Sequence, residues 1–206
     1  MFTISFNNYQ YKIRYPINRD SVVLSHTDGT KDPWWMYVWA SGIALSSFAV
    51  EQNINGKSVL EVGPGLGLAS IVLKKQGNDV SVHDINPDIL PYLLLNSQEN
   101  EVQMPTWVES LESDPNTYDV VVSSDVMYNI HKIPQLVSSM FNKMKETGKL
   151  IICEPDRPMM IRNLEKTLTD QNIPFSVTVV TAVRGDAPTS DESNTIKIYT
   201  IQKEGL

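Results

Sequence analysis

SVLEVGPGLG, residues 58–67, is the stretch of the sequence that decides the expected fold. Residues 58–62 form a short apolar run interrupted by one acid, which is typical of a strand buried on both faces of a parallel sheet. Gly63, Gly65 and Gly67 follow at alternate positions, and residues 68–73 then carry apolar side chains at helical spacing. A glycine-rich turn between a strand and a helix lets a ligand lie against the backbone. The stretch therefore predicts a site for a nucleotide-like ligand, with a tight turn that binds nothing as the alternative.

Two acids near this turn indicate the class of ligand. The dinucleotide fingerprint is G-x-G-x-x-G, whereas the glycines here are spaced G-x-G-x-G and follow Glu61. An acid at the end of the strand would repel a pyrophosphate, but it would pair with an amino group or a sulfonium. Asp84, at the end of the strand predicted over 79–84, lies 21 residues after Gly63. This spacing matches the position, about 20 residues on, from which a carboxylate reaches ribose hydroxyls.

The combination of E-x-G-x-G-x-G with HDINP at residues 83–87 resembles the S-adenosylmethionine site of the seven-strand (class I) methyltransferases. The resemblance implies that the first motif contacts the methionine moiety of the cofactor and that Asp84 contacts its ribose. Trp107 or Glu109, at the end of the strand predicted over 106–110, is expected to contact the adenine, with packing or solvent exposure as the alternative. The full set of cofactor-binding residues expected on this basis is Trp39, Glu61, Gly63, Gly65, Gly67, Asp84, Ile85, Trp107, Glu109 and Ser124.

Two further motifs resemble the protein-lysine methyltransferases within this class. DPWWMYVWASGIAL, residues 32–45, precedes the glycine motif and predicts a buried helix over residues 34–50, with Trp39 beside the cofactor. SSDVMY, residues 123–128, matches the D-x-x-Y motif that follows the fourth strand in this subgroup. The resemblance implies that Asp125 orients the acceptor lysine and that Tyr128 packs or hydrogen-bonds at the catalytic mouth. Without the resemblance, Asp125 would be interpreted as a helix cap and Tyr128 as a core residue.

The segment EPDRP, residues 154–158, resembles the D-P-G-R-P segment of the members that act on the electron-transfer flavoprotein β subunit. It departs from that segment because Glu154 replaces Asp and Asp156 replaces Gly, so the target protein stays open. Arg157 is predicted either to bind an acidic group of a protein substrate or to pair with Glu154 or Asp156.

The order of the predicted elements indicates the α/β class. It predicts a doubly wound, mostly parallel sheet of seven strands. Strands are predicted at 58–62, 79–84, 106–110, 118–126 and 149–155, and predicted helices separate them except between the third and the fourth. The last two runs, 175–183 and 195–202, predict a terminal antiparallel hairpin, which departs from the dinucleotide-binding arrangement. We expect one domain over residues 1–206, with a β-rich extension at 1–33 and the cofactor-binding core at 34–206.

The composition of the chain narrows the kinds of partner that it can bind and the cellular compartment in which we expect it. The net charge of −7 argues against a protein that binds duplex nucleic acid and agrees better with a basic protein substrate. Cys153 is the single cysteine, which favours a reducing, cytoplasmic location. The 17 uncharged residues 34–50 are interrupted by serine and glycine and do not predict a membrane span. No metal-ligand spacing is present among the histidines and the cysteine.

We therefore interpret the sequence as that of an S-adenosylmethionine-dependent methyltransferase that acts on a lysine of another protein. A small-molecule N-methyltransferase and a non-catalytic member that binds cofactor or protein are the alternatives. A nicotinamide oxidoreductase is disfavoured because its glycine spacing differs. The sequence leaves the acceptor, the number of methyl groups and the oligomeric state open.

Overall fold

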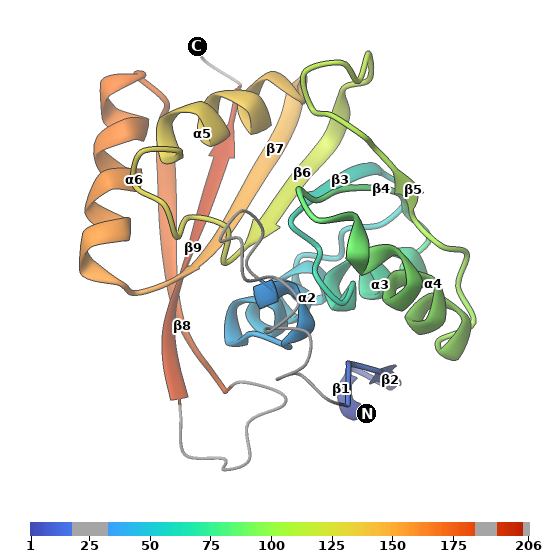
Figure 1. Cartoon of the computed structure of the whole chain (residues 1–206). Coiled ribbons are helices and arrows are strands. Elements are labelled where there is room, and N and C mark those ends of the chain that lie inside the picture. The colour runs from blue at the N-terminus through green and yellow to red at the C-terminus, as the bar shows by residue number, and fades with distance from the viewer. Residues whose placement is uncertain (18–32, 184–192, 204–206) are drawn as a thin grey trace.

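A seven-stranded sheet with the order β5-β4-β3-β6-β7-β9-β8 forms the centre of the computed structural model, which describes residues 1–17, 33–183 and 193–203 (Figure 1). The five strands from β5 to β7 are parallel neighbours, whereas β9 runs antiparallel to both β7 and β8. The predicted fold class and its terminal antiparallel hairpin are therefore confirmed. In sheet order the strands are β5 (Thr106–Trp107), β4 (Asp79–His83), β3 (Ser58–Val62), β6 (Tyr118–Ser124), β7 (Met144–Pro155), β9 (Ser193–Gln202) and β8 (Phe175–Val183).

Helices cover both faces of this sheet, which is why its central strands are mainly apolar. Val59 of β3 packs in one core cluster and the next residue, Leu60, packs in the other, because successive side chains of a strand point to opposite faces. The first cluster includes residues of α2, α3 and α4, and the second includes residues of α5 and α6 (Figure 1). The helices are α2 (Ala40–Glu51), α3 (Leu68–Lys75), α4 (Leu90–Glu99), α5 (Ile133–Asn142) and α6 (Pro158–Asp170), with short 3-10 turns η1 (Pro33–Met36) and η2 (Pro87–Ile89). None of the helices in the described parts of the chain is long and apolar enough to cross a membrane.

The predicted helix over residues 34–50 is wrong in its first part. Residues Pro33–Met36 form the 3-10 turn η1, and α2 begins only at Ala40. Trp39 precedes α2 with extended backbone angles, φ −72° and ψ 150°, and its indole Nε1 donates a hydrogen bond to the carbonyl oxygen of Trp34 at 2.9 Å. Trp35 and Trp39 therefore do not share a helix face. An uncharged segment fits either a helix or a folded turn, so composition alone did not distinguish them.

Several strand boundaries also differ from the prediction, and the largest differences are at β5 and β7. β5 ends at Trp107 rather than at residue 110, and β7 begins at Met144 rather than at residue 149. At Gly148 a Cβ atom would lie 2.9 Å from the carbonyl oxygen of Lys145 and 3.1 Å from that of Tyr118. The absence of a side chain at this glycine lets the backbone segments approach closely where β7 meets the start of β6.

An N-terminal hairpin is attached to the core through α4. β1 (Phe2–Phe6) and β2 (Tyr9–Ile13) pair with each other in a separate antiparallel sheet. The side-chain amide of Asn100 accepts from the backbone N–H of Lys12 at 2.9 Å and donates to its carbonyl at 2.7 Å, and Asn96 pairs in the same way with Arg14 at 2.7 and 3.0 Å. The β-rich character predicted for the extension is present at its beginning, while residues 18–32 lie outside the described part.

Candidate active site

A cavity of about 410 Å³ lies against the carboxyl ends of β3, β4 and β6. Here β4 lies on one side of β3 and β6 on the other, so the direction of the crossover connections reverses at this point of the sheet. Such a switch point is where open α/β sheets bind ligands. The residues predicted from sequence that line the cavity are Trp39, Glu61, Gly63, Gly65, Asp84, Ile85, Ser124, Asp125 and Tyr128.

The glycine loop forms one wall of the cavity and is packed tightly from behind. Gly63 and Gly65 have left-handed φ angles of +73° and +52°. A Cβ atom on Gly63 would lie 2.4 Å from Cγ1 of Val126, and a Cβ on Gly65 would lie 3.1 Å from the carbonyl oxygen of Trp35. Larger residues would therefore strain the loop and displace its neighbours. Gly67 ends the loop as the residue before α3 and does not itself line the cavity.

Glu61 places a buried acid in the cavity wall. Only 1% of the residue is exposed, and Ser70 Oγ of α3 donates a hydrogen bond to its carboxylate. Burial raises the pKa of Glu61 to about 7, with hydrogen bonding to Ser70 acting in the opposite direction and the nearby charge of Asp84 raising it further. A cationic ligand in the cavity would favour the ionised form of this acid. The observation fits the amino group and sulfonium of S-adenosylmethionine.

Asp84 stands in the same cavity at the end of β4. Its Oδ1 accepts a hydrogen bond from the backbone N–H of Asn86 at 2.9 Å, and its carboxylate also interacts with backbone groups of Gly65 and Ile85. Burial raises the pKa of Asp84, while these backbone hydrogen bonds lower it. The loop thus holds a carboxylate in fixed orientation beside the glycine wall, which suits the two hydroxyl groups of a ribose.

Aromatic side chains from the turn before α2 border the cavity. The ring centroid of Trp39 lies 5.4 Å from that of Tyr37 and 6.4 Å from that of Trp34. All three residues line the cavity, and Trp34 keeps 49% of its surface exposed. Trp39 is thus placed where a side chain can contact a ligand held by the glycine loop.

Asp125 lies directly after β6, with an unusual backbone conformation. Its φ of +54° is left-handed, and its N–H donates to the carbonyl oxygen of Cys153 on β7 at 3.0 Å. Its side chain is only 7% exposed, and Nη1 and Nη2 of Arg157 contact its two oxygens at 2.6 and 3.2 Å. Burial raises the pKa of Asp125, although Arg157 opposes this shift. Since Lys132 precedes α5 and makes no side-chain cap, Asp125 is not the helix cap of the alternative interpretation.

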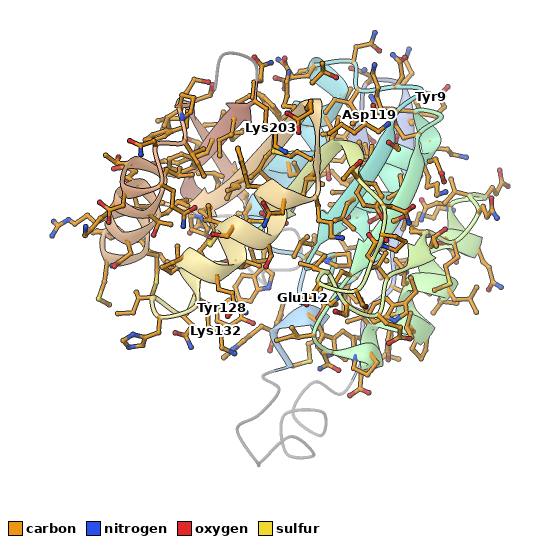
Figure 2. All side chains as sticks on the ribbon, turned by 90° about the horizontal axis from the view of Figure 1, so that it is seen from above. Tyr9, Glu112, Asp119, Tyr128, Lys132 and Lys203 are labelled. Atoms are coloured by element: carbon orange, nitrogen blue, oxygen red, sulfur yellow. The ribbon has the colours of Figure 1, made fainter. Side chains whose placement is uncertain are left out.

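Tyr128 lies at the mouth of the cavity rather than in the core. It is 47% exposed, and Figure 2 shows it near Lys132 at one edge of the molecule, far from Asp119 at the other end of β6. Both Tyr128 and Lys132 line the cavity. The D-x-x-Y motif thus places its acid inside the cavity and its aromatic ring at the entrance.

The structure resolves how Arg157 pairs and assigns a structural role to Glu154. Arg157 contacts Asp125, whereas Asp156 lies 3.5 Å from the Nζ atom of Lys197. Glu154 is buried, and its Oε1 accepts hydrogen bonds from the backbone N–H groups of Val126 at 2.9 Å and Met127 at 3.2 Å. Burial raises the pKa of Glu154 to about 8, and the charge of Asp125 raises it further. The motif around Glu154 was visible in the sequence, but its contact with the residues after Asp125 depends on the pairing of β6 with β7.

Besides Gly67, two more residues predicted to contact the cofactor do not line the cavity. Trp107 is half-buried against core residues, with its ring centroid 6.4 Å from that of His83, and Glu109 is exposed. Leu111 and Glu112, a few residues further along, line the cavity instead. Because β5 ends at Trp107, the path of the following loop decides which side chain reaches the cavity, and the alternation of a strand does not predict that path.

Raised acid pKa values predict how stability depends on pH. Burial raises the pKa of Glu61 to about 7 and of Glu154 to about 8, so both bind protons more tightly in the folded state than in the unfolded state. Their stabilising effect is complete below the unfolded value near 4.5 and is lost as the pH rises through 7–8. We expect the free energy of unfolding, measured by urea titration without cofactor, to fall between pH 5 and 8.5 by more than about 1.4 kcal/mol, the equivalent of one pKa unit.

Glu154→Gln is the matched variant for this test, because its amide oxygen can still accept from Val126 and Met127 without ionising. The variant should show a shallower decline of unfolding free energy with pH than the unmodified chain. Stability that rises over this interval, or an equal decline in the variant, would contradict the prediction.

The fold and the cavity together define an α/β protein with a nucleotide-like ligand site at the switch point of its sheet. Residues 37–181 match the family model of a methyltransferase domain, and the chain belongs to this family.

Individual relatives agree with this assignment. The chain is 28% identical over 137 residues to the electron transfer flavoprotein beta subunit lysine methyltransferase of Homo sapiens, covering 62% of this chain and 51% of that protein. It is 24% identical over 188 residues to the calmodulin-lysine N-methyltransferase of Arabidopsis thaliana, covering 84% and 58%. The chain thus spans about half the length of these curated relatives. The magnesium protoporphyrin IX methyltransferase ChlM of Synechocystis PCC 6803, solved with bound SAM, has a TM-score of 0.57 at 20% identity and covers 77% of each chain. The resemblance to lysine-directed methyltransferases expected from the motifs is confirmed.

Proposed function

We propose that this chain is an S-adenosylmethionine-dependent methyltransferase whose acceptor is a lysine side chain of another protein. The observation that carries the proposal is the placement of Asp125 in the same cavity as Glu61 and Asp84, with Tyr128 at its mouth. Both curated relatives described above are lysine methyltransferases by name. The net charge of −7 favours a basic protein region over a nucleic acid as the substrate, and the single cysteine favours a cytoplasmic location.

The residues that line the cavity suit the cofactor in their charge and in the room that they leave beside the backbone. Glu61 is suited to the cationic methionine moiety, Asp84 to the ribose hydroxyls, and the glycine loop to close approach of the ligand to the backbone. Leu111 and Glu112 replace Trp107 and Glu109 as the residues we expect at the adenine, because they line the cavity. When bound, the cofactor supplies a methyl group on a sulfonium, which a nucleophile displaces directly.

The chain contributes mainly by positioning the acceptor. Alignment of two reacting groups can supply roughly 7–11 kcal/mol of the barrier reduction. Asp125 is placed to accept a hydrogen bond from the acceptor nitrogen, and Tyr128 with Trp34 offers aromatic surface around the aliphatic part of a lysine at the entrance. A lysine with a reference pKa of about 10.4 must also lose a proton, which costs about 4 kcal/mol near pH 7.4 at 1.36 kcal/mol per unit. A cavity that excludes water favours the neutral amine.

Labelled methyl transfer tests this function. The full chain is incubated with S-adenosylmethionine that carries a radioactive methyl group and with a cell lysate heated to inactivate its own enzymes. Label in a protein, located on lysine by mass spectrometry and dependent on Asp125, is the expected result. Label recovered only in the small-molecule fraction would replace the proposed acceptor with a small amine. Binding of S-adenosylhomocysteine without any transfer would favour a non-catalytic member.

A further inference from the structure

Three ionisable side chains meet at the cavity wall formed by Asp125, and each comes from a different structural position. Asp125 follows β6, Glu154 lies near the end of β7, and Arg157 immediately precedes α6. Arg157 contacts both oxygens of Asp125, at 2.6 and 3.2 Å. Asp125 is 7% exposed at its side chain and Arg157 is 43% exposed. The carboxylate that faces the cavity is therefore buried, while the guanidinium that pairs with it remains partly exposed.

This pairing bears on a difficulty in methylating an amine. Only the neutral amine can attack a methyl group, yet a lone carboxylate beside a lysine favours its ammonium form. A lone carboxylate would thus orient the acceptor and, at the same time, oppose its deprotonation. A carboxylate whose charge is already balanced by a guanidinium would orient the amine with a much smaller opposing effect.

We propose, building on the proposed lysine acceptor, that Arg157 is a positioning residue that balances the charge of Asp125, so that Asp125 orients the acceptor amine without holding it in its protonated form. Arginine suits this role because its guanidinium stays protonated and its fork contacts both oxygens of a carboxylate. Each carboxylate oxygen has two lone pairs, so an amine can still donate to Asp125 while Arg157 is bound.

The surroundings of the pair support charge balance. Glu154 faces the same site, and its raised pKa of about 8 keeps it mainly neutral at pH 7. Its Oε2 atom is buried and has no hydrogen-bond partner among the described residues, so no ion pair holds Glu154 in its charged form through this atom. Glu154 also fixes the backbone after Asp125 through Val126 and Met127. The cluster then holds one negative and one positive charge.

Other ionisable groups near the cluster do not disturb this balance. Asp156 is 3.5 Å from Lys197, which also lies 3.6 Å from Glu165 on α6. Burial raises the pKa of the Cys153 thiol and of the Tyr199 hydroxyl, so both stay neutral at pH 7. Arg157 is accordingly the cation that Asp125 contacts in the described part of the chain.

The first test measures the charge of Asp125 without an acceptor. The full chain with carbon-13-labelled aspartate and bound S-adenosylhomocysteine is titrated by NMR, with the Asp125 signal assigned from Asp125→Asn. We expect Arg157→Gln to raise the Asp125 titration midpoint by at least one pH unit, a tenfold weaker acid, and Arg157→Lys, which retains the charge, to shift it by less than half a unit. An unchanged midpoint in Arg157→Gln, or equal shifts in the two variants, would overturn the proposal.

The second test measures the consequence for transfer. With the acceptor protein found by methyl labelling, Arg157→Gln should lower kcat at pH 7.5 at least tenfold, and the deficit should shrink as the pH rises to 9.5, where more acceptor is neutral. A purely structural role would instead lower kcat by a similar factor at every pH, which would contradict the inference. If the unmodified chain labels no protein lysine, the proposed function fails, whereas the NMR titration still decides whether Arg157 balances Asp125.

Discussion

Replacing Asp125 by Asn is expected to reduce methyl transfer at least 100-fold while the affinity for S-adenosylhomocysteine changes less than about threefold. Asn is similar in shape and tolerates the left-handed backbone at this position, where φ is +54°, so the fold should survive. The change removes the charge that Arg157 contacts and leaves one oxygen in place of two. Misplacement of a reacting group by about 1 Å can cost about 100-fold in rate. The measurements are kcat for labelled transfer and the calorimetric Kd of S-adenosylhomocysteine.

Asp119→Asn is the matched control for this experiment. Asp119 lies near the start of β6, at the end of this strand away from Asp125, and Figure 2 labels it there. It pairs with Lys145 at 2.8 Å and accepts a hydrogen bond from Ser58 Oγ at 2.7 Å. This control should lose stability but retain turnover once folded. Equal turnover of Asp125→Asn and the unmodified chain, or loss of cofactor binding by Asp125→Asn, would remove the assigned role of Asp125.

Replacing Asp84 by Ala is expected to weaken S-adenosylhomocysteine binding by about 10- to 150-fold. A hydrogen bond to a charged group contributes about 1.5–3 kcal/mol, and each 1.4 kcal/mol changes Kd tenfold. The loop and the glycine wall already fix the carboxylate of Asp84, so little of its binding energy is needed for ordering. Calorimetric titration gives the ratio of Kd values, with NAD as a comparison ligand that should bind neither protein.

Asp88→Ala controls for general effects on the same loop. Asp88 is exposed and does not line the cavity, so this variant should bind S-adenosylhomocysteine as the unmodified chain does. If Asp84→Ala retains the original affinity, the ribose is held elsewhere. If both variants weaken binding equally, the loop as a whole rather than the Asp84 carboxylate would carry the effect.

The fold was predictable because its signals are local in the sequence. The apolar run of β3, the turn with Gly63 and Gly65 and the acid Asp84 lie within one strand–helix–strand unit, and that unit specifies a parallel sheet. The absence of a helical pattern between residues 175 and 202 likewise predicted the antiparallel pairing of β8 with β9. Asp125, which lines the cavity, was instead assigned from the resemblance of SSDVMY to the D-x-x-Y motif.

The remaining details depend on contacts between distant segments. The turn before α2 is stabilised by the hydrogen bond from Trp39 to Trp34, and an uncharged aromatic sequence does not predict where such a turn ends. Leu111 and Glu112 line the cavity because β5 is short and the loop turns after it. Arg157 pairs with Asp125 because the start of α6 lies close to the end of β6. No sequence motif predicts how near these two ends lie.

The close approach of Gly63 to Val126 couples the glycine loop to the loop that follows β6. A Cβ atom at position 63 would lie only 2.4 Å from Cγ1 of Val126, so the two loops are already in van der Waals contact. A chimaera designed to change the methyl acceptor by exchanging residues 125–128 would therefore alter cofactor affinity as well, unless position 126 keeps a side chain of the size of valine. Positions 63 and 126 should be exchanged as a pair whenever acceptor loops are transferred between relatives.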